Sequence, residues 1–138
     1  VLLLLLPLAG FSFAEVNWLL LMGTLVCTSL ALTSLGFCVA WLLDSVQAYH
    51  AIQMVVLVPL WVLSGAMFPI VGAHPVLSTI IEFNPLSYAI SALRHALSSD
   101  AALLRTTLHP TPGGDFLFLL GFCGVCLLLS TRLASRRA

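Results

Sequence analysis

Long apolar stretches without charged residues alternate with short polar segments along this chain. Residues 16–43 carry no charge, and at about 1.5 Å per residue their roughly 42 Å exceeds the roughly 30 Å of a bilayer's hydrocarbon core. Further apolar stretches follow a polar segment at 44–50, which is short enough to be a turn between antiparallel helices. The pattern predicts membrane-spanning helices at about 17–43, 51–73 and 116–133.

The first residues, 1–14 (VLLLLLPLAGFSFA), are also uncharged. They are typical either of the outer part of a truncated spanning helix or of the apolar core of a signal peptide. We expect the helix, because the later stretches predict several spans and no basic leader precedes this one. Since the sequence begins inside a leucine run, we expect it to be the C-terminal half of a longer membrane protein.

Prolines interrupt the chain between the second and the last predicted span. Pro59 removes one backbone hydrogen bond from the 51–73 helix, so a kink is expected there. Phe68 and Pro69 mark the end of regular helix. Irregular backbone at membrane depth is tolerated only beside protein or a water-filled path, so this region is a candidate for a transport path.

Two short helices are predicted after this break, at about 75–83 and 85–98. Asn84-Pro85 is typical of a helix N-cap followed by proline at the first helical position. In the second helix an apolar stripe faces away from a polar one; the stripes are Leu86, Ile90, Leu93 and Leu97 against Ser87, Ser91, Arg94 and Ser98. We therefore expect a re-entrant or interfacial helix pair that lies against the membrane.

Composition supports this all-α, polytopic architecture for the whole chain, 1–138. Hydrophobic residues make up 61% and charged residues 7%, whereas soluble domains have about 25% charged residues. The formal net charge is zero, so nucleic acid has no electrostatic reason to bind. Lysine is absent, which excludes a P-loop and Schiff-base chemistry. We expect no enzymatic activity in this chain, and energy for transport has to come from elsewhere.

Arginines follow the last predicted span, at Arg132, Arg136 and Arg137. Positive residues next to a span mark its cytoplasmic side. We therefore predict a multi-pass protein of the plasma (cell inner) membrane with a cytoplasmic C-terminus. Counting back through the spans places 70–115 outside and the turn at 44–50 inside.

Candidate chemical sites are few. The cysteines lie in apolar spans, and we interpret them, Cys123-x-x-Cys126 included, as small packing residues. The histidines fall on both predicted sides of the membrane, so we expect no metal site and no cofactor. No Ser-His-Asp arrangement is suggested by spacing.

Glu82 is the most informative carboxylate of the predicted helix pair. It lies three residues before Pro85, and the following helix carries Arg94. An ionisable group inside a membrane indicates function and needs a partner. Two interpretations stand: Glu82 pairs with Arg94 and shapes an outer gate, or the two side chains reach water separately at the membrane surface.

Two motifs occur in a fixed order: Leu63-Ser64-Gly65 with Phe68-Pro69, then Asn84-Pro85 with Tyr88 and Arg94. Followed by a last span with an arginine tail, this order resembles the C-terminal half of the ABC-2 type permeases. These are the membrane subunits of ABC exporters for drugs, oligosaccharides and polysaccharides. The similarity covers roughly residues 16–138.

The resemblance implies an all-helical subunit with six spans in its complete form. It implies that two such permeases, identical or different, work with two ATP-binding subunits on the cytoplasmic side. In this picture the kinked helix lines the path with Pro59 and Trp61, the two short helices shape its outer mouth, and the turn at 44–50 faces the ATPase. The motif residues are then candidates for a gate.

Two other classes of protein remain as alternatives. A secondary transporter or channel would also use broken helices, but it should carry several ionisable or coordinating groups near mid-membrane. A non-transporting membrane anchor would not need prolines around one hairpin.

Overall fold

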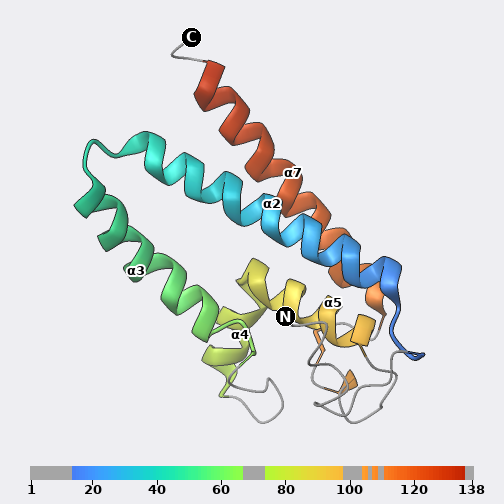
Figure 1. The fold of residues 1–138 in the computed structure, drawn as a ribbon. Coiled ribbons are helices and arrows are strands. Elements are labelled where there is room, and N and C mark those ends of the chain that lie inside the picture. The colour runs from blue at the N-terminus through green and yellow to red at the C-terminus, as the bar shows by residue number, and fades with distance from the viewer. Residues whose placement is uncertain (1–13, 67–73, 98–103, 106, 109–110, 136–138) are drawn as a thin grey trace.

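The computed structural model describes residues 14–66, 74–97, 104–105, 107–108 and 111–135, and its regular structure there is helical throughout. The helices are α2 (Trp18–Leu42), α3 (Val46–Val62), α4 (Pro75–Phe83), α5 (Pro85–Leu97) and α7 (Pro112–Ser135) (Figure 1). The predicted fold class is confirmed: a helical membrane bundle with a broken helix pair before the last span. The predicted helix at 1–14 lies almost wholly outside the described residues.

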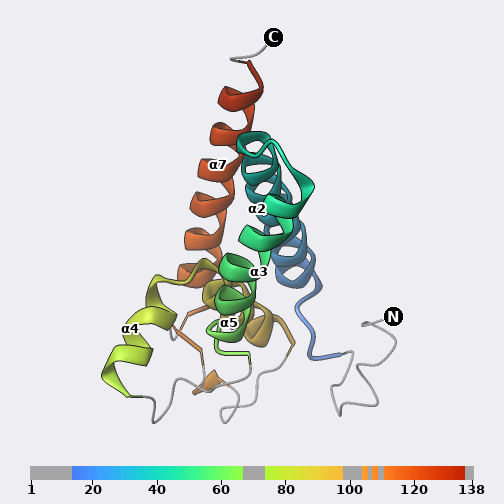
Figure 2. The same cartoon turned by 90° about the vertical axis from the view of Figure 1, so that its left-hand side faces the viewer.

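Among the described residues, α2 and α7 are the helices long and apolar enough to cross a bilayer. They run side by side in the same direction, and α3 returns alongside α2 the opposite way (Figures 1 and 2). Both helices show large apolar side chains on their outer surface, such as Leu19 and Leu117. Such surfaces suit a lipid environment, where apolar side chains gain no hydrophobic free energy by being buried inside the protein.

Small side chains allow α2 and α7 to approach closely. A Cβ atom built on Gly23 of α2 would lie 3.1 Å from the ring of Phe116 on α7. The buried residues of α2 include Thr24, Ala31 and Ser34, so little bulk separates the helices along this face. Close backbone approach is the main source of helix association in lipid.

The helix α5 packs beneath α2 and α7, and it does so with its small residues. Its buried side chains are Ser87, Tyr88, Ala89, Ser91, Ala92 and Ala96. The sequence predicts the polar stripe of this helix, and the structure adds that Ser87 and Ser91 of that stripe are buried. The reason is again that small residues allow close helix contact where lipid offers no hydrophobic gain.

A main-chain hydrogen bond joins the start of α2 to the end of α5. The main-chain N–H of Asn17 donates to the carbonyl of Ala96 over 2.8 Å, and Val16, Leu21 and Ala96 form a small buried apolar cluster. The side chain of Asn17 also caps α2 by accepting from the N–H of Leu20. This contact brings the beginning of α2 and the end of α5 to the same end of the bundle.

The helix α3 begins earlier than predicted. Ser45 caps it, its hydroxyl accepting from the N–H of Ala48 over 3.1 Å, so 46–50 is helical and the predicted turn at 44–50 is too long. At its other end the helix stops at Val62 rather than continuing to 73. Residues 67–73, which include Phe68 and Pro69, lie outside the described residues.

The predicted break at Asn84-Pro85 is present. The axes of α4 and α5 meet at 85°, and the Asn84 carboxamide accepts from the N–H of Leu86 at the start of α5. His74 caps α4, and Pro75 occupies its first turn. The helix pair and the beginnings of α2 and α7 share one end of the molecule, whereas the α2–α3 turn and the end of α7 share the other (Figure 2).

Bulk added at Gly23 should weaken the α2–α7 contact. We expect Gly23→Leu to destabilise the full-length protein by about 1–3 kcal/mol, because a branched side chain has no room against Phe116. Gly121→Leu is the matched control, since nothing lies within 4 Å of a Cβ built there. Thermal melting of the purified proteins in detergent measures the difference, and equal melting temperatures for the two variants would contradict this packing.

Candidate functional site

The C-terminal end of α3 is the point where the sequence motifs meet. The last carbonyls of a helix have no partner within it. Here the N–H of Leu63 donates to the main-chain carbonyl of Pro59 over 2.9 Å. The hydroxyl of Ser64 donates to the main-chain carbonyl of Trp61 over 2.6 Å. These contacts close the last turn but leave the carbonyls of Leu60 and Gly65 to other partners.

Gly65 adopts a left-handed backbone conformation, with φ of 78°. Glycine tolerates this region because it has no Cβ, and it is the usual residue just beyond a helix. The residue is buried, so its carbonyl also needs a partner within the protein. The Leu63-Ser64-Gly65 motif therefore ends α3 and turns the chain away from its axis.

Asn84 joins this end of α3 to the corner between α4 and α5. Its amide nitrogen Nδ2 donates to the carbonyl of Leu60 over 2.6 Å, while Oδ1 accepts from the N–H of Leu86 over 3.0 Å. The residue is buried. One side chain thus satisfies a carbonyl at the end of α3 and an amide at the start of α5.

Arg94 makes the second connection between the same two regions. Its Nη2 donates to the carbonyl of Gly65 over 2.7 Å. The guanidinium lies near the C-terminal end of α3, where the helix dipole favours positive charge. A half-buried cation on α5 therefore stabilises the end of a helix that lies 29 residues earlier in the chain.

No ion pair between the described residues Glu82 and Arg94 is present in this structure, so their pairing stays a prediction. The carboxylate of Glu82 lies on an exposed part of α4, and its main-chain carbonyl accepts from the hydroxyl of Tyr88 over 2.8 Å. The ring of Tyr88 stacks on Phe118 of α7, with centroids 3.7 Å apart. Tyr88 thus fixes the α4–α5 corner against α7.

An open groove lies beside these contacts, between α3 and α4. It has a volume of about 340 Å³, and its lining is mainly apolar: Pro59, Leu60, Leu63, Thr79, Ile80, Phe83, Asn84 and Pro85. Trp61 is exposed on the same turn of α3. Of the described residues predicted to form the gate or the path, four line this groove: Pro59, Leu63, Asn84 and Pro85. Glu82 and Tyr88 instead line a neighbouring opening with Phe83 and Phe118.

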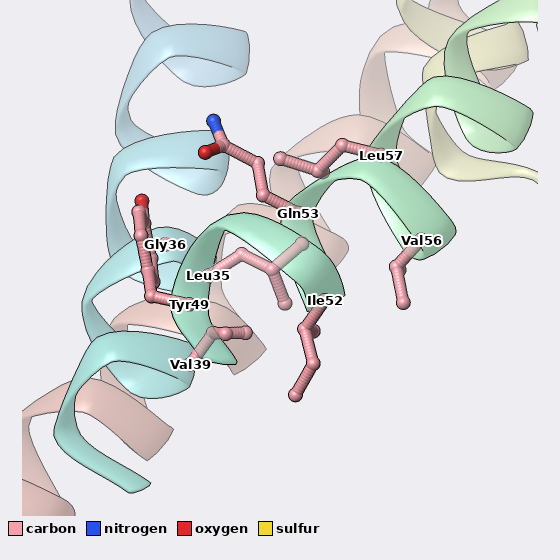
Figure 3. Close-up of a pocket in the computed structure, with 8 residues that line it drawn as sticks. All are labelled: Leu35, Gly36, Val39, Tyr49, Ile52, Gln53, Val56 and Leu57. Atoms are coloured by element: carbon pink, nitrogen blue, oxygen red, sulfur yellow. The ribbon is translucent and has the colours of Figure 1, made fainter. Parts of the chain in front are cut away.

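A second, smaller cavity lies between α2 and α3. Figure 3 shows Tyr49 and Gln53 of α3 directed toward the part of α2 that contains Gly36. Its volume is about 70 Å³, far below the roughly 300 Å³ or more of ligand sites. A Cβ on Gly36 would lie 3.7 Å from the Tyr49 hydroxyl, so this cavity is best explained as a gap in helix packing.

A cluster of Ser91, His95 and Asp115 was missed by the sequence analysis, which saw no Ser-His-Asp arrangement. The Ser91 hydroxyl donates to Oδ2 of Asp115 and accepts from the N–H of Leu108 over 2.9 Å. Nε2 of His95 lies 3.8 Å from the same carboxylate oxygen. The side chains of His95 and Asp115 are 5% and 0% exposed.

The order of these groups does not suit nucleophilic catalysis. In a Ser-His-Asp triad the imidazole stands between the hydroxyl and the carboxylate, so that it can take the hydroxyl proton. Here the carboxylate stands between the other two groups. The one sequence signal for the cluster was Asp115 itself, an acidic residue directly before an apolar span, where helix N-termini stabilise negative charge.

The cysteines lie within α2 and α7. Cys123 and Cys126 are buried on α7, whereas Cys27 and Cys38 on α2 are partly buried, and all four thiols are free. Within the described part of the chain, no three metal-ligating side chains gather as a metal site would require.

Comparison with known proteins supports the family suggested by the motifs. The profile of the family described as "ABC-2 type transporter" matches residues 1–98, which include both motif segments. Nodulation protein J of Neorhizobium galegae is 33% identical over 102 residues, covering 74% of this chain and 34% of that protein. Nodulation protein J of Rhizobium leguminosarum bv. trifolii is 38% identical over 81 residues, covering 56% and 31%.

No solved structure matches this chain significantly. The chain spans about a third of the length of these curated relatives. Because the family profile covers most of the chain, from its first residue to the end of α5, this protein belongs to the ABC-2 type transporter family.

Proposed function

We propose that this chain is part of the permease subunit of an ABC exporter. It contributes to the path of the transported molecule, and a separate ATP-binding subunit supplies the energy. The observation that supports this most is the double connection at the end of α3, from Asn84 to Leu60 and from Arg94 to Gly65. It joins the helix that lines the groove to the helix pair that closes it on one side.

This arrangement suits a gate that moves as a unit. Two hydrogen bonds to main-chain carbonyls join the end of α3 to the helix pair α4 and α5. A displacement of either segment should therefore displace the other. Packed elements of this kind have discrete alternative positions rather than continuous ones. The groove beside them is mainly apolar, which suits an amphiphilic cargo.

The proposed orientation places the arginine tail and the α2–α3 turn in the cytoplasm. The end of α7, which carries Arg132, and the α2–α3 turn share one end of the bundle (Figure 1), and positive residues favour the cytoplasmic side. The α2–α3 turn is then a contact for the ATP-binding subunit. The helix pair α4 and α5 lies at the outer surface of the cell inner membrane.

A second permease copy, identical or different, completes the path in this proposal. In the described part of the chain no residue of α3 is buried, and its exposed side chains include Met54, Val55 and Trp61. Lipid or a second subunit can cover such a helix. A path formed between two permeases requires that each contributes a helix of this kind.

Loss of the hydrogen-bond donor of Asn84 should disconnect the end of α3 from the corner between α4 and α5. We expect Asn84→Asp to lower ATP hydrolysis by the reconstituted full-length complex about tenfold. An aspartate keeps the cap on α5 but cannot donate a hydrogen bond to the carbonyl of Leu60. A buried carbonyl without a donor costs about 1–3 kcal/mol. Asn17→Asp is the matched control, since Asn17 acts as an acceptor at its own helix cap. Arg94→Ala should resemble Asn84→Asp. Activity equal to the control in both variants would remove the gate assignment.

An ATP-binding subunit should accompany the full-length permease during purification. We expect affinity-tagged permease, extracted in mild detergent, to retain a protein with a Walker motif in stoichiometric amount, and this complex to hydrolyse ATP. Transport by permease alone, driven by an ion gradient in liposomes without any ATPase, would instead identify a secondary transporter.

Cysteine labelling tests the proposed sides of the membrane. In a cysteine-free full-length protein, Thr111→Cys should react with an impermeant maleimide in intact cells, whereas Asp44→Cys should react only after the membrane is opened. Both positions are exposed. Asp44 lies in the α2–α3 turn and Thr111 directly precedes α7, and the turn and the beginning of α7 lie at opposite ends of the bundle (Figure 1). Labelling of both residues from outside would contradict the topology.

A further inference from the structure

The cluster of Ser91, His95 and Asp115 joins three segments that are far apart in the sequence. Asp115 lies in the first turn of α7, Ser91 and His95 lie one turn apart on α5, and Leu108 belongs to the connection between the two helices. The carboxylate of Asp115 is fully buried. A buried carboxylate is costly unless its surroundings compensate it.

The surroundings of Asp115 do compensate the carboxylate. The Ser91 hydroxyl donates to it, and that hydroxyl is itself oriented by the N–H of Leu108. The N-terminal end of α7 favours negative charge. The imidazole of His95 is directed to the same oxygen. The carboxylate is therefore an organised attachment point between α5 and α7.

The same turn of α5 also carries Arg94. Residues 91 and 95 contact the start of α7, while Arg94 reaches the carbonyl of Gly65 at the end of α3. The position of α5 on α7 thus decides whether the guanidinium can reach that carbonyl. We propose that Asp115 is a positioning residue, and that Ser91, His95 and Asp115 form a latch that docks α5 on α7 and so holds the end of α3 in place.

This inference rests on the proposed function, because the latch acts on the gate described above. It adds Asp115, which lies on the last span and outside both sequence motifs. In this proposal Asp115 affects the end of α3 through the position of Arg94. Breaking the latch should release the end of α3 while α2 and α7 stay packed. Ser64 is a suitable reporter, since it is 2% exposed at that end.

The experiment uses the full-length permease in native membranes with its other cysteines replaced and Ser64→Cys introduced. Maleimide labelling of this cysteine should be slow in the parent, and Asp115→Ala should accelerate it about tenfold or more by raising the population in which α3 is released. Asp115→Asn keeps an acceptor for Ser91 and should give a smaller increase. It also provides a folded variant should Asp115→Ala fail to reach the membrane.

Two controls separate a latch from general loosening. Ala31→Leu adds bulk at a buried position of α2, about two turns beyond Gly23 and its contact with Phe116, and should leave the labelling rate unchanged. In an Arg94→Ala background, Asp115→Ala should add little, because both changes break the same connection. Unchanged labelling in both Asp115 variants, equal acceleration by Ala31→Leu, or additive effects with Arg94→Ala would each overturn the latch. Since labelling needs neither ATP nor cargo, this result is independent of the tests of exporter function.

Discussion

The carbonyl groups at the end of α3 impose the constraint on which this structure depends. The last carbonyls of a helix have no partner within the helix, and where they are removed from water they need donors from another part of the chain. Asn84 supplies the donor for Leu60 and Arg94 supplies it for Gly65. Both donors belong to the bent helix pair, so the end of α3 and that pair are structurally one unit. Asn84 and Arg94 belong to one of the two sequence motifs, and Gly65, the acceptor for Arg94, belongs to the other.

The bundle around this unit is assembled through small side chains. Gly23 lets α2 approach Phe116 on α7, and α5 is buried through serines and alanines. Large apolar residues face outward, as Leu19 and Leu117 do. In water the same pattern would expose an apolar surface, whereas in lipid it leaves the core free for close helix packing and for polar contacts. Asp115 can lie within this core because its partners are already in place.

Much of the helical architecture could be predicted from the sequence, because uncharged stretches and proline positions act locally. The break at Asn84-Pro85 is an example. The partners of Arg94 and Asp115 could not be predicted. Arg94 meets a main-chain carbonyl that no residue type reveals, and Asp115 meets Ser91, which lies 24 residues away. The burial of the serines of α5 could not be predicted either, because amphipathicity alone does not say whether serines face water or a neighbouring helix.

The common direction of α2 and α7 has a consequence for the chain between them. Two neighbouring spans that both pass from the outer to the inner leaflet must be separated by an odd number of crossings. In the proposed topology the helix α3, which returns in the opposite direction (Figure 2), provides one. The bent pair α4 and α5 must then enter and leave by the same leaflet, and the 85° corner is what lets it turn back. In that topology, parity of crossings makes the pair a re-entrant hairpin rather than a broken span.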